Sequence, residues 1–391
     1  MKSFLFSYLI IIPWLINLNA ANASIMTCQE SPAATVFVPF ELEIDPMERL
    51  LLINIENDPD SIYIGFEPQV FDDDINGRGM LIIGWRFDGR VDVYHQPGLK
   101  PDPYKFNIAG KGLAHIAERL LEGAFLEIND QGAQTWFSFA DVYDRPIEIS
   151  LSESHPAKRR PFGLLAPMGH ATENPRGLPL VLLHDFYFVR RAHTELTVEI
   201  NGRHHKPDKL PMPLNGRRMY FARYSPDPLI LTLNPEKNAS LQVLPVENDG
   251  HAYTGNTSIE LTDHATAPGI KSLSRSYKHH TVTLSFAPAF PNLKELIDGE
   301  IMEGQFDVKG HSSTGKVAGV YRVEKLNGSI EISMTPSKGW IPNERSWSLR
   351  FLYSINRIFK SWPSTYTWTA VLTPEEAGEY EIASNWQRNG T

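Results

Sequence analysis

The sequence predicts an all-β, mostly antiparallel protein with a few helices, organised as two barrel- or sandwich-like halves. Short runs of alternating apolar and polar residues recur along the chain, and Gly, Pro, Asn and Asp separate them, as is typical of strands and turns. Asp88–Gly89 and Asn327–Gly328 each lie between two such runs, and these dipeptides favour tight hairpins. The hydrophobic content of 42% is sufficient for a substantial core.

Most of the first half is predicted to form strands. They cover residues 35–44, 50–55, 61–66, 80–86, 90–94, 124–128, 133–140 and 147–152. One helix is predicted over residues 111–122, because Leu113, Ile116 and Leu120 recur at helical spacing. The segment 155–179 is rich in Pro and Gly, which indicates a long loop between strands.

The stretch over residues 178–224 organises the chain and contains the candidate site. Its apolar run, residues 180–189, is interrupted by His184 and Asp185, and an alternating strand over residues 194–200 follows. A strand that is buried on both faces either packs in a solid core or lines a cavity. The ionisable groups favour a cavity, because ligand pockets use a few convergent polar groups to orient the ligand.

The pairing of these two strands determines the surroundings of Asp185. We predict a hairpin in which Ala192–His193 forms the turn and Val189 lies opposite Leu196. In this register Asp185 lies opposite Ile200 on the buried face, where a carboxylate must be paired, hydrogen-bonded or protonated. Its expected partners are Arg190, Arg191 and Arg223. Such an ion pair either stabilises the packing of the two strands or belongs to a functional site.

The main functional hypothesis is the binding of a lipophilic or aromatic small molecule inside such a cavity. The residues predicted to contact the ligand are Phe186, Phe188, Arg190 and Tyr224. An alternative is a cofactor-free isomerase, hydratase or cyclase with acid–base groups in the same cavity. Its catalytic residues would be Asp185, His184, Tyr220 and Arg223. A third hypothesis is a non-catalytic envelope scaffold. Nucleophile-elbow, phosphate-loop, dinucleotide and HExxH motifs are all absent from the sequence, and no cofactor is predicted.

No metal site is predicted. His204–His205 and His279–His280 are adjacent pairs, and adjacent residues on a strand point to opposite faces, so neither pair is expected to chelate one ion. Residues 72–77 begin like a calcium loop, but Ile83 occupies the position that requires a bidentate acid. We interpret this segment as a solvated acidic turn.

The last third of the chain is predicted to be a strand meander, with strands over residues 301–308, 316–325, 329–336, 365–372 and 380–387. Before it, a strand is expected over residues 229–233, and a short strand over residues 258–261 lies in a polar region and belongs to either side of it. The polar residues 246–280 are predicted to link an N-terminal β domain, residues 24–245, to a C-terminal β domain, residues 281–391. This architecture resembles tandem lipocalin-like barrels. The resemblance is one of fold class only, and it implies an interior that holds one small ligand.

Residues 343–362 interrupt the strand pattern with a predicted amphipathic helix. Its apolar stripe consists of Trp347, Phe351, Ile355, Ile358 and Trp362, which recur every three or four residues. Its basic residues are Arg345, Arg350, Arg357 and Lys360. The preferred interpretation is a helix that packs over a sheet. The other is peripheral membrane contact through the helix from Arg345 to Trp362.

Residues 1–23 are predicted to be an export signal peptide. Lys2 precedes an apolar segment, residues 4–18, and Ala21–Asn22–Ala23 fits the small-residue cleavage rule. Cys28 is the only cysteine, so no intramolecular disulfide is possible. These features predict a periplasmic or secreted protein after cleavage near Ala23. The formal net charge of −9 argues against nucleic acid as the main partner.

Overall fold

A computed structural model describes residues 34–107, 109–166, 175–263, 268–343, 346–356, 358–375 and 378–389. The predicted signal peptide and Cys28 lie outside these residues. The described residues form 27 strands and two short α-helices. All strand pairs but one in this part of the chain are antiparallel, the parallel pair being β6 and β7. The predicted all-β, mostly antiparallel fold class is therefore confirmed.

The first of two ten-stranded sheets has the strand order β2-β16-β12-β15-β3-β4-β5-β6-β7, and β11 pairs with β12 beside this path. Its strands are β2 (Leu42–Asp45), β3 (Arg49–Asn54), β4 (Tyr63–Asp73), β5 (Gly77–Arg86), β6 (Val91–His95), β7 (Leu113–Glu118), β11 (Phe162–Ala166), β12 (Leu178–Arg190), β15 (Met219–Ser225) and β16 (Pro228–Leu233). The chain turns from β5 into β6 at Asp88–Gly89, as predicted, and Trp85 lies opposite Val91. The 3₁₀ helix η1 (Pro103–Phe106) precedes β7.

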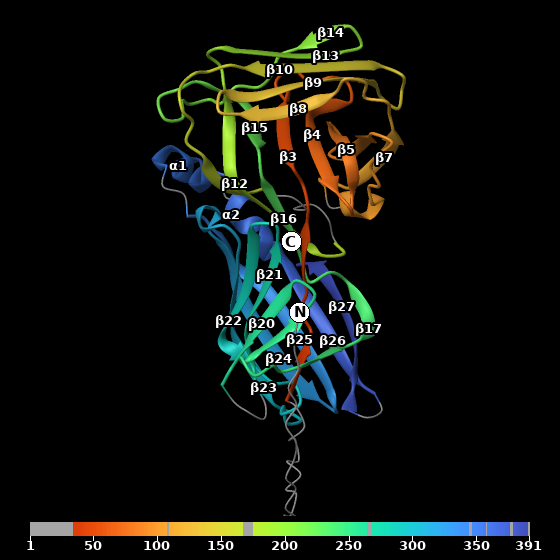
Figure 1. Ribbon diagram of the computed structural model, residues 1–391, viewed down its shortest axis with the longest axis vertical. Coiled ribbons are helices and arrows are strands. Elements are labelled where there is room, and N and C mark those ends of the chain that lie inside the picture. Colours follow the sequence, from red (N-terminus) through yellow and green to blue (C-terminus); the bar gives the residue numbers. More distant parts are fainter. Residues whose placement is uncertain are drawn as a thin grey trace, which may run out of the picture. The chain divides into compact units, whose positions relative to one another are not determined.

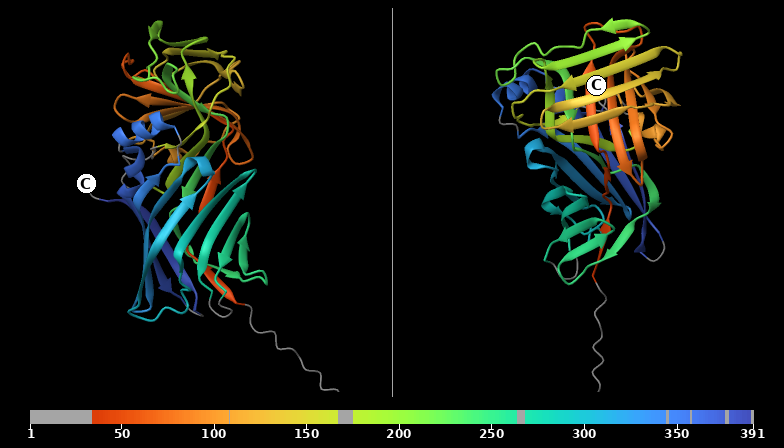
Figure 2. Two further views of the ribbon diagram at one scale, coloured as in Figure 1. Left: turned by 90° about the vertical axis from the view of Figure 1, so that its left-hand side faces the viewer. Right: turned by 45° about the horizontal axis from the view of Figure 1, so that its top comes forward.

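A five-stranded sheet lies across β3, β4 and β5 of this sheet (Figures 1 and 2). Its order is β14-β13-β10-β9-β8. Its strands are β8 (Phe125–Asn129), β9 (Gly132–Ala140), β10 (Pro146–Glu153), β13 (Thr194–Ile200) and β14 (Arg203–His205). Phe137, Ile149 and Val198 point inward from it and share a buried cluster with Ile53 and Phe66. The two sheets thus form a sandwich over one apolar core.

The second ten-stranded sheet is curled and has the order β17-β27-β26-β25-β24-β23-β22-β21-β20-β19 (Figure 2, left). Its strands are β17 (Lys237–Ser240), β19 (His251–Thr254), β20 (Thr257–Leu261), β21 (Ile270–Tyr277), β22 (His280–Phe290), β23 (Ile301–Lys309), β24 (Lys316–Leu326), β25 (Ser329–Ile341), β26 (Tyr366–Pro374) and β27 (Tyr380–Arg388). The 3₁₀ helix η2 (Ser312–Thr314) lies between β23 and β24, and β1 (Thr35–Val38) pairs with β18 (Gln242–Pro245).

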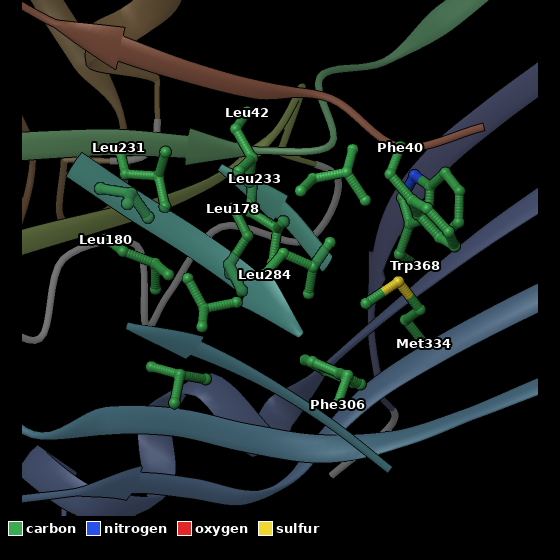
Figure 3. Packing of buried hydrophobic residues seen from close by; sticks show 14 of the residues in the cluster. Phe40, Leu42, Leu178, Leu180, Leu231, Leu233, Leu284, Phe306, Met334 and Trp368 are labelled. Carbon is green, nitrogen blue, oxygen red and sulfur yellow. The ribbon is translucent and has the colours of Figure 1, made fainter. Parts of the chain in front are cut away.

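One hydrophobic cluster joins the two ten-stranded sheets. Leu42, Leu178 and Leu231 project from β2, β12 and β16 of the first sheet (Figure 3). They belong to the same buried cluster as Leu284 and Phe306 of the curled sheet. One edge of the first sheet therefore packs against the curled sheet, and the core is continuous from one to the other.

The hairpin predicted between β12 and β13 does not form. β13 pairs with β10 and β14, whereas β12 pairs with β11, β15 and β16. Leu196 consequently lies opposite Leu151, and Ile200 lies opposite Ile147. The physical reason is that residues 191–193, with His193 at φ 57°, form a turn that carries the chain into another sheet.

Residues 113–118 form strand β7 rather than the predicted helix. β7 runs parallel to β6 at the edge of the sheet, with Ile116 opposite Val93. Leu120, expected on the apolar face of the helix, is 72% exposed. Gly112, just before β7, has φ 98°, which favours a turn over a helix start. Helical spacing over so short a segment does not distinguish a helix from an edge strand, and pairing with β6 decides the outcome.

The polar segment 246–280 contributes β19, β20 and β21 to the curled sheet, although its composition indicates a linker. Ile259 and Leu273 lie opposite each other and are buried, whereas the neighbouring pair Ser258 and Ser274 lies on the other face. Strands with one Ser- and Thr-rich face are polar on average, so composition alone conceals their alternation. Residues 34–391 form one compact unit.

The predicted amphipathic helix is shorter than expected and is interrupted. Leu349 and Tyr353 are buried, and the Tyr353 ring packs 5.1 Å from that of Trp340. By contrast, three members of the predicted apolar stripe face solvent, with exposed fractions of 68% for Trp347, 44% for Phe351 and 63% for Ile355. The elements are α1 (Trp347–Ile355), α2 (Ile358–Ser361) and the 3₁₀ helix η3 (Trp362–Thr365). The helix therefore packs through a different face than the sequence indicates.

Candidate functional site

Two neighbouring cavities lie beside the strands of the first ten-stranded sheet. The first, named the arginine cavity after Arg223 in its wall, has a volume of about 170 Å³. The second, named the apolar cavity, has a volume of about 250 Å³. Leu50, Glu67 and Val181 line both cavities, so the two share part of a wall. The remaining wall of the arginine cavity is mainly apolar and includes Leu52, Leu164, Leu183, Phe186 and Phe359.

Among the described residues, no carboxylate lies at contact distance from the cation Arg223, although the charges of Glu67 and Glu56 favour its charged form. It lies on β15 between Leu52 of β3 and Phe188 of β12. Its Nη1 donates a hydrogen bond of 2.9 Å to Asn54 Oδ1, and its guanidinium carbon lies 4.6 Å from the centre of the Phe221 ring. None of the described residues forms an ion pair with it. Burial lowers the pKa of Arg223 to about 10, so the side chain is still charged at neutral pH.

Glu67 is the second ionisable group in the shared wall. Its side chain accepts hydrogen bonds from Gln69 Nε2 at 2.8 Å and Trp85 Nε1 at 3.1 Å, and the residue is only 5% exposed. Burial raises the pKa of Glu67 above its ordinary value, although these hydrogen bonds and the charge of Arg223 act in the opposite direction. The shared wall therefore combines a charged guanidinium with a carboxyl group that resists ionisation.

The apolar cavity has a charged rim around an apolar interior. Phe71, Leu81 and Ile83 are among its apolar lining residues. At the rim, Lys105 pairs with Asp45. Glu43, Asp102 and Arg176 also line this cavity. Such a cavity suits a ligand with an apolar body that enters from a polar surface.

Five of the eight predicted site residues line cavities. Phe186, Arg223 and Tyr224 all line the arginine cavity. Phe188 and Arg190 line a separate cavity of about 330 Å³, named the basic cavity. Lys158, Arg159, Arg160 and Arg217 also line the basic cavity. The structure thus distributes the predicted ligand-binding residues between two places.

Asp185, Tyr220 and His184 line none of these three cavities. Asp185 is half-buried, and within the described part of the chain it forms no ion pair with the expected arginines. The expected pairing fails because it depends on the hairpin that does not form. His184 instead joins a cluster around Asp227, with 3.1 Å between His184 Nε2 and Asp227 Oδ2.

Arg190 belongs to a buried structural network. Its Nε lies 2.7 Å from Glu153 Oε1, and its Nη atoms donate to the carbonyl oxygens of Ala157 and Gln131 at 2.8 and 2.7 Å. The Tyr224 hydroxyl donates to Glu153 Oε2 at 3.0 Å. Burial and the charge of Glu153 raise the pKa of Tyr224 well above its ordinary value. These contacts connect β12 and β15 to β10, so they hold the sandwich together rather than offering free groups to a ligand.

Sequence reasoning missed Glu67 and Trp85. Pro68 follows Glu67 directly, and a proline in an apparent strand favours its end, so the predicted strand 61–66 stopped seven residues before the end of β4 and left Glu67 out. In the structure β4 continues to Asp73, and Pro68 lies opposite Ile82. A charged residue inside a long apolar strand was the signal that could have identified Glu67.

Sequence reasoning also discounted the histidines that surround Asp227. His279 lies in the turn between β21 and β22, so strand alternation does not separate it from His280. Both rings approach Asp227, with Nε2–oxygen distances of 2.6 and 2.8 Å. Burial alone would raise the pKa of Asp227, but the hydrogen bonds from the three imidazoles of His184, His280 and His279 lower it well below its ordinary value.

The chain matches no protein-family model, no curated protein and no solved structure. Its function must therefore be inferred from the geometry of these sites.

Proposed function

We propose that the protein binds a small lipophilic molecule that carries an acidic group, with the acidic group on Arg223 and the apolar body in the adjoining cavities. The observation that carries this proposal is a charged, partly buried arginine in an apolar wall, for which the described residues provide no ion-pair partner. Keeping a charge out of water is costly unless a counter-charge compensates it. A ligand carboxylate supplies that charge, and a guanidinium fork binds a carboxylate with two parallel hydrogen bonds.

The size of the cavities supports a small ligand. Ordinary small-molecule sites occupy about 300–1,000 Å³. The apolar and arginine cavities, at about 250 and 170 Å³, are each smaller, but they share a wall. We place the acidic group of a ligand of modest length at Arg223 and its apolar body past Leu50 and Val181, in the apolar cavity. We further propose that binding takes place in the periplasm or outside the cell, as the predicted signal peptide indicates.

The acid–base alternative receives less support from the same geometry. It requires His184, Asp185, Tyr220 and Arg223 to converge on one substrate. Of these four, only Arg223 lines the arginine cavity. Ligand binding therefore remains the better proposal, and Arg223 serves to orient the ligand.

A matched pair of ligands tests the proposal. A fluorescent long-chain carboxylic acid and the corresponding alcohol are titrated separately into the native protein at neutral pH. We expect the acid to bind about tenfold or more tightly than the alcohol, because only the acid neutralises Arg223. Equal affinities would show that the charge is not recognised, and absence of binding by both ligands would refute the proposed function.

The raised pKa of Glu67 predicts a pH-dependent loss of stability. Folding raises this pKa above 4.5, so the folded chain binds more protons than the unfolded chain between the two values. The contribution of Glu67 to the free energy of unfolding is present below pH 4.5. It is lost as the pH rises through the pKa that Glu67 has in the folded protein. We expect Glu67→Gln to remove this loss, so that the variant gains stability over the native protein as the pH increases.

The measurement is urea unfolding of native protein and Glu67→Gln at several pH values, with Glu127→Gln as the control. Glu127 is exposed, so its replacement is expected to leave the pH profile unchanged. Parallel profiles for native protein and Glu67→Gln would contradict the assignment of a raised pKa to Glu67.

A second candidate function, peripheral contact with a membrane surface, is favoured by the exposed face of α1. Trp347, Phe351 and Ile355 are spaced four residues apart and are all exposed, and the first two rings stack at 5.9 Å. Exposed Arg350 adds positive charge beside them. Aromatic residues on one face of a helix with nearby cations are typical of helices that lie in a lipid interface. No helix among the described residues has the length and apolar character needed to cross a bilayer.

We expect the double substitution Trp347→Ser and Phe351→Ser to reduce flotation with lipid vesicles. Burying each ring in the lipid interface contributes up to about 1.5–3 kcal/mol, so the loss of affinity exceeds about tenfold. The matched control is Phe87→Ser, because Phe87 is 72% exposed and lies far from α1 in the sequence. Native protein that does not float with either zwitterionic or anionic vesicles, or a double variant that floats equally well, would contradict membrane contact.

A further inference from the structure

Three imidazoles converge on the carboxylate of Asp227. His184 projects from β12, His279 and His280 come from the turn into β22, and Asp227 lies between β15 and β16. The distances to Asp227 Oδ2 are 3.1 Å from His184 Nε2 and 2.6 Å from His279 Nε2. His280 Nε2 lies 2.8 Å from the other carboxylate oxygen, Oδ1. Segments that are far apart in the sequence therefore contribute to one cluster of nitrogen and oxygen ligands.

We propose that His184, His280 and Asp227 bind one divalent transition-metal ion, with zinc as the best-suited member of the class. Two imidazole nitrogens and a carboxylate oxygen form a common donor set for zinc. One ligand atom from each residue lies within 4.8 Å of the other two. Tetrahedral ligand atoms at about 2.0–2.1 Å from zinc are about 3.3 Å from each other, so a small rearrangement admits the ion.

Burial of the side chains supports a built site rather than a chance surface cluster. The side chains of His184 and His280 each retain 9% exposure, and that of Asp227 retains 27%. The His311 ring covers His184 at a distance of 4.7 Å between ring centres. The Nδ1 atom of His311 lies 2.7 Å from Ser313 Oγ. The His184 ring is thus packed in place under His311 before an ion arrives, which lowers the cost of forming the site.

A separate observation gives the site access to solutes. A cavity of about 260 Å³ is lined by Asp227, His279 and His280. With three protein ligands, zinc retains a fourth position for water or another molecule. Asp227 and His280 border this cavity together with His279, whose side chain is 67% exposed, so solutes can reach two of the three proposed ligands. The geometry therefore corresponds to an open metal site rather than a closed structural one.

The alternative for the same cluster is a set of hydrogen bonds that fastens the two ten-stranded sheets without a metal. The metal hypothesis differs from it in a measurable way, since only a metal site binds zinc or cobalt stoichiometrically. It is also independent of the proposed ligand binding, because neither Arg223 nor the arginine cavity contributes a ligand.

The test uses chelator-treated full-length protein titrated with Zn²⁺ in competition with a chromophoric chelator. We expect one ion per chain with a Kd of about 1 µM or lower. Co²⁺ is expected to give the visible absorption of a four- or five-coordinate complex. Asp227→Asn and His280→Gln are each expected to weaken zinc binding by about a hundredfold. The control is His204→Gln, since the His204 side chain is 75% exposed and remote from the cluster.

Circular dichroism and the unfolding midpoint of each metal-free variant show whether it is folded. If Asp227→Asn fails to fold, His280→Gln and the Co²⁺ spectrum of native protein still decide the question. Zinc binding weaker than about 100 µM by native protein would overturn the proposal. So would equal zinc affinities of native protein and a folded Asp227→Asn or His280→Gln variant, or an equal loss in His204→Gln.

Discussion

Replacing Arg223 with methionine is expected to lower the affinity for a long-chain carboxylic acid by about a hundredfold, while the affinity for the corresponding alcohol changes little. The reason is that a desolvated charge pair contributes about 2–5 kcal/mol to binding, and methionine retains the apolar volume without the charge. Fluorescence titration of both ligands into native and variant protein measures this difference. An acid that binds the variant as tightly as the native protein would show that Arg223 is not the anchor.

Two further variants show whether the change in affinity caused by Arg223→Met comes from the loss of the Arg223 guanidinium itself. Arg322→Met removes an arginine whose side chain is 41% exposed and pairs with Glu303 and Glu324, and it is expected to bind both ligands normally. Arg223→Lys retains the charge but not the planar fork, so an intermediate affinity for the acid is expected. Since Arg223→Met also removes the hydrogen bond to Asn54, urea unfolding must show that the variant is folded before its titration is interpreted.

The largest effect on stability is expected for Glu153→Ala, at about 3–5 kcal/mol of unfolding free energy. Glu153 is fully buried, and its carboxylate lies 2.7 Å from Arg190 Nε and 3.0 Å from the Tyr224 hydroxyl. Removing it leaves the Arg190 charge buried without a counter-charge. Gly132 allows this close packing, because a Cβ at that position would lie 2.5 Å from the Glu153 side chain.

The control for this prediction is Glu303→Ala. The Glu303 side chain is 68% exposed and lies 3.5 Å from Arg322, so its loss is expected to cost no more than about 1 kcal/mol. Urea unfolding at neutral pH measures both variants. If Glu153→Ala costs no more than Glu303→Ala, the Glu153–Arg190 network does not stabilise the sandwich.

The strands bounded by strong turn dipeptides could be predicted from sequence. Asp88–Gly89 and Asn327–Gly328 determine their hairpins locally, and the β5–β6 and β24–β25 pairs follow. The partner of β13 could not be predicted, because it is β10, which lies more than 40 residues earlier in the chain. Local alternation shows which face of a strand is buried, but it does not identify the strand across the sheet.

The same limit applies to the candidate site. Arg223, Phe186 and Tyr224 were selected for their charge or aromaticity within a buried stretch, and they line one cavity. Glu67 and Asp227 were not identified. Glu67 was missed because the predicted strand ended before Pro68, although its partners Gln69 and Trp85 lie nearby on β4 and the adjacent β5. For Asp227 the neighbours are His184 and His280, which are separated from it by about 43 and 53 residues. Such sites arise from tertiary packing, which a single sequence does not display.

The most direct test of the proposed function is native mass spectrometry of protein purified from its own host, combined with solvent extraction of the bound compound. The predicted result is native protein with one bound lipophilic acid per chain, and Arg223→Met purified in the same way without it. A bare native chain with no extractable compound, or a neutral compound equally retained by Arg223→Met, would contradict the proposal that Arg223 anchors an acidic lipophilic ligand.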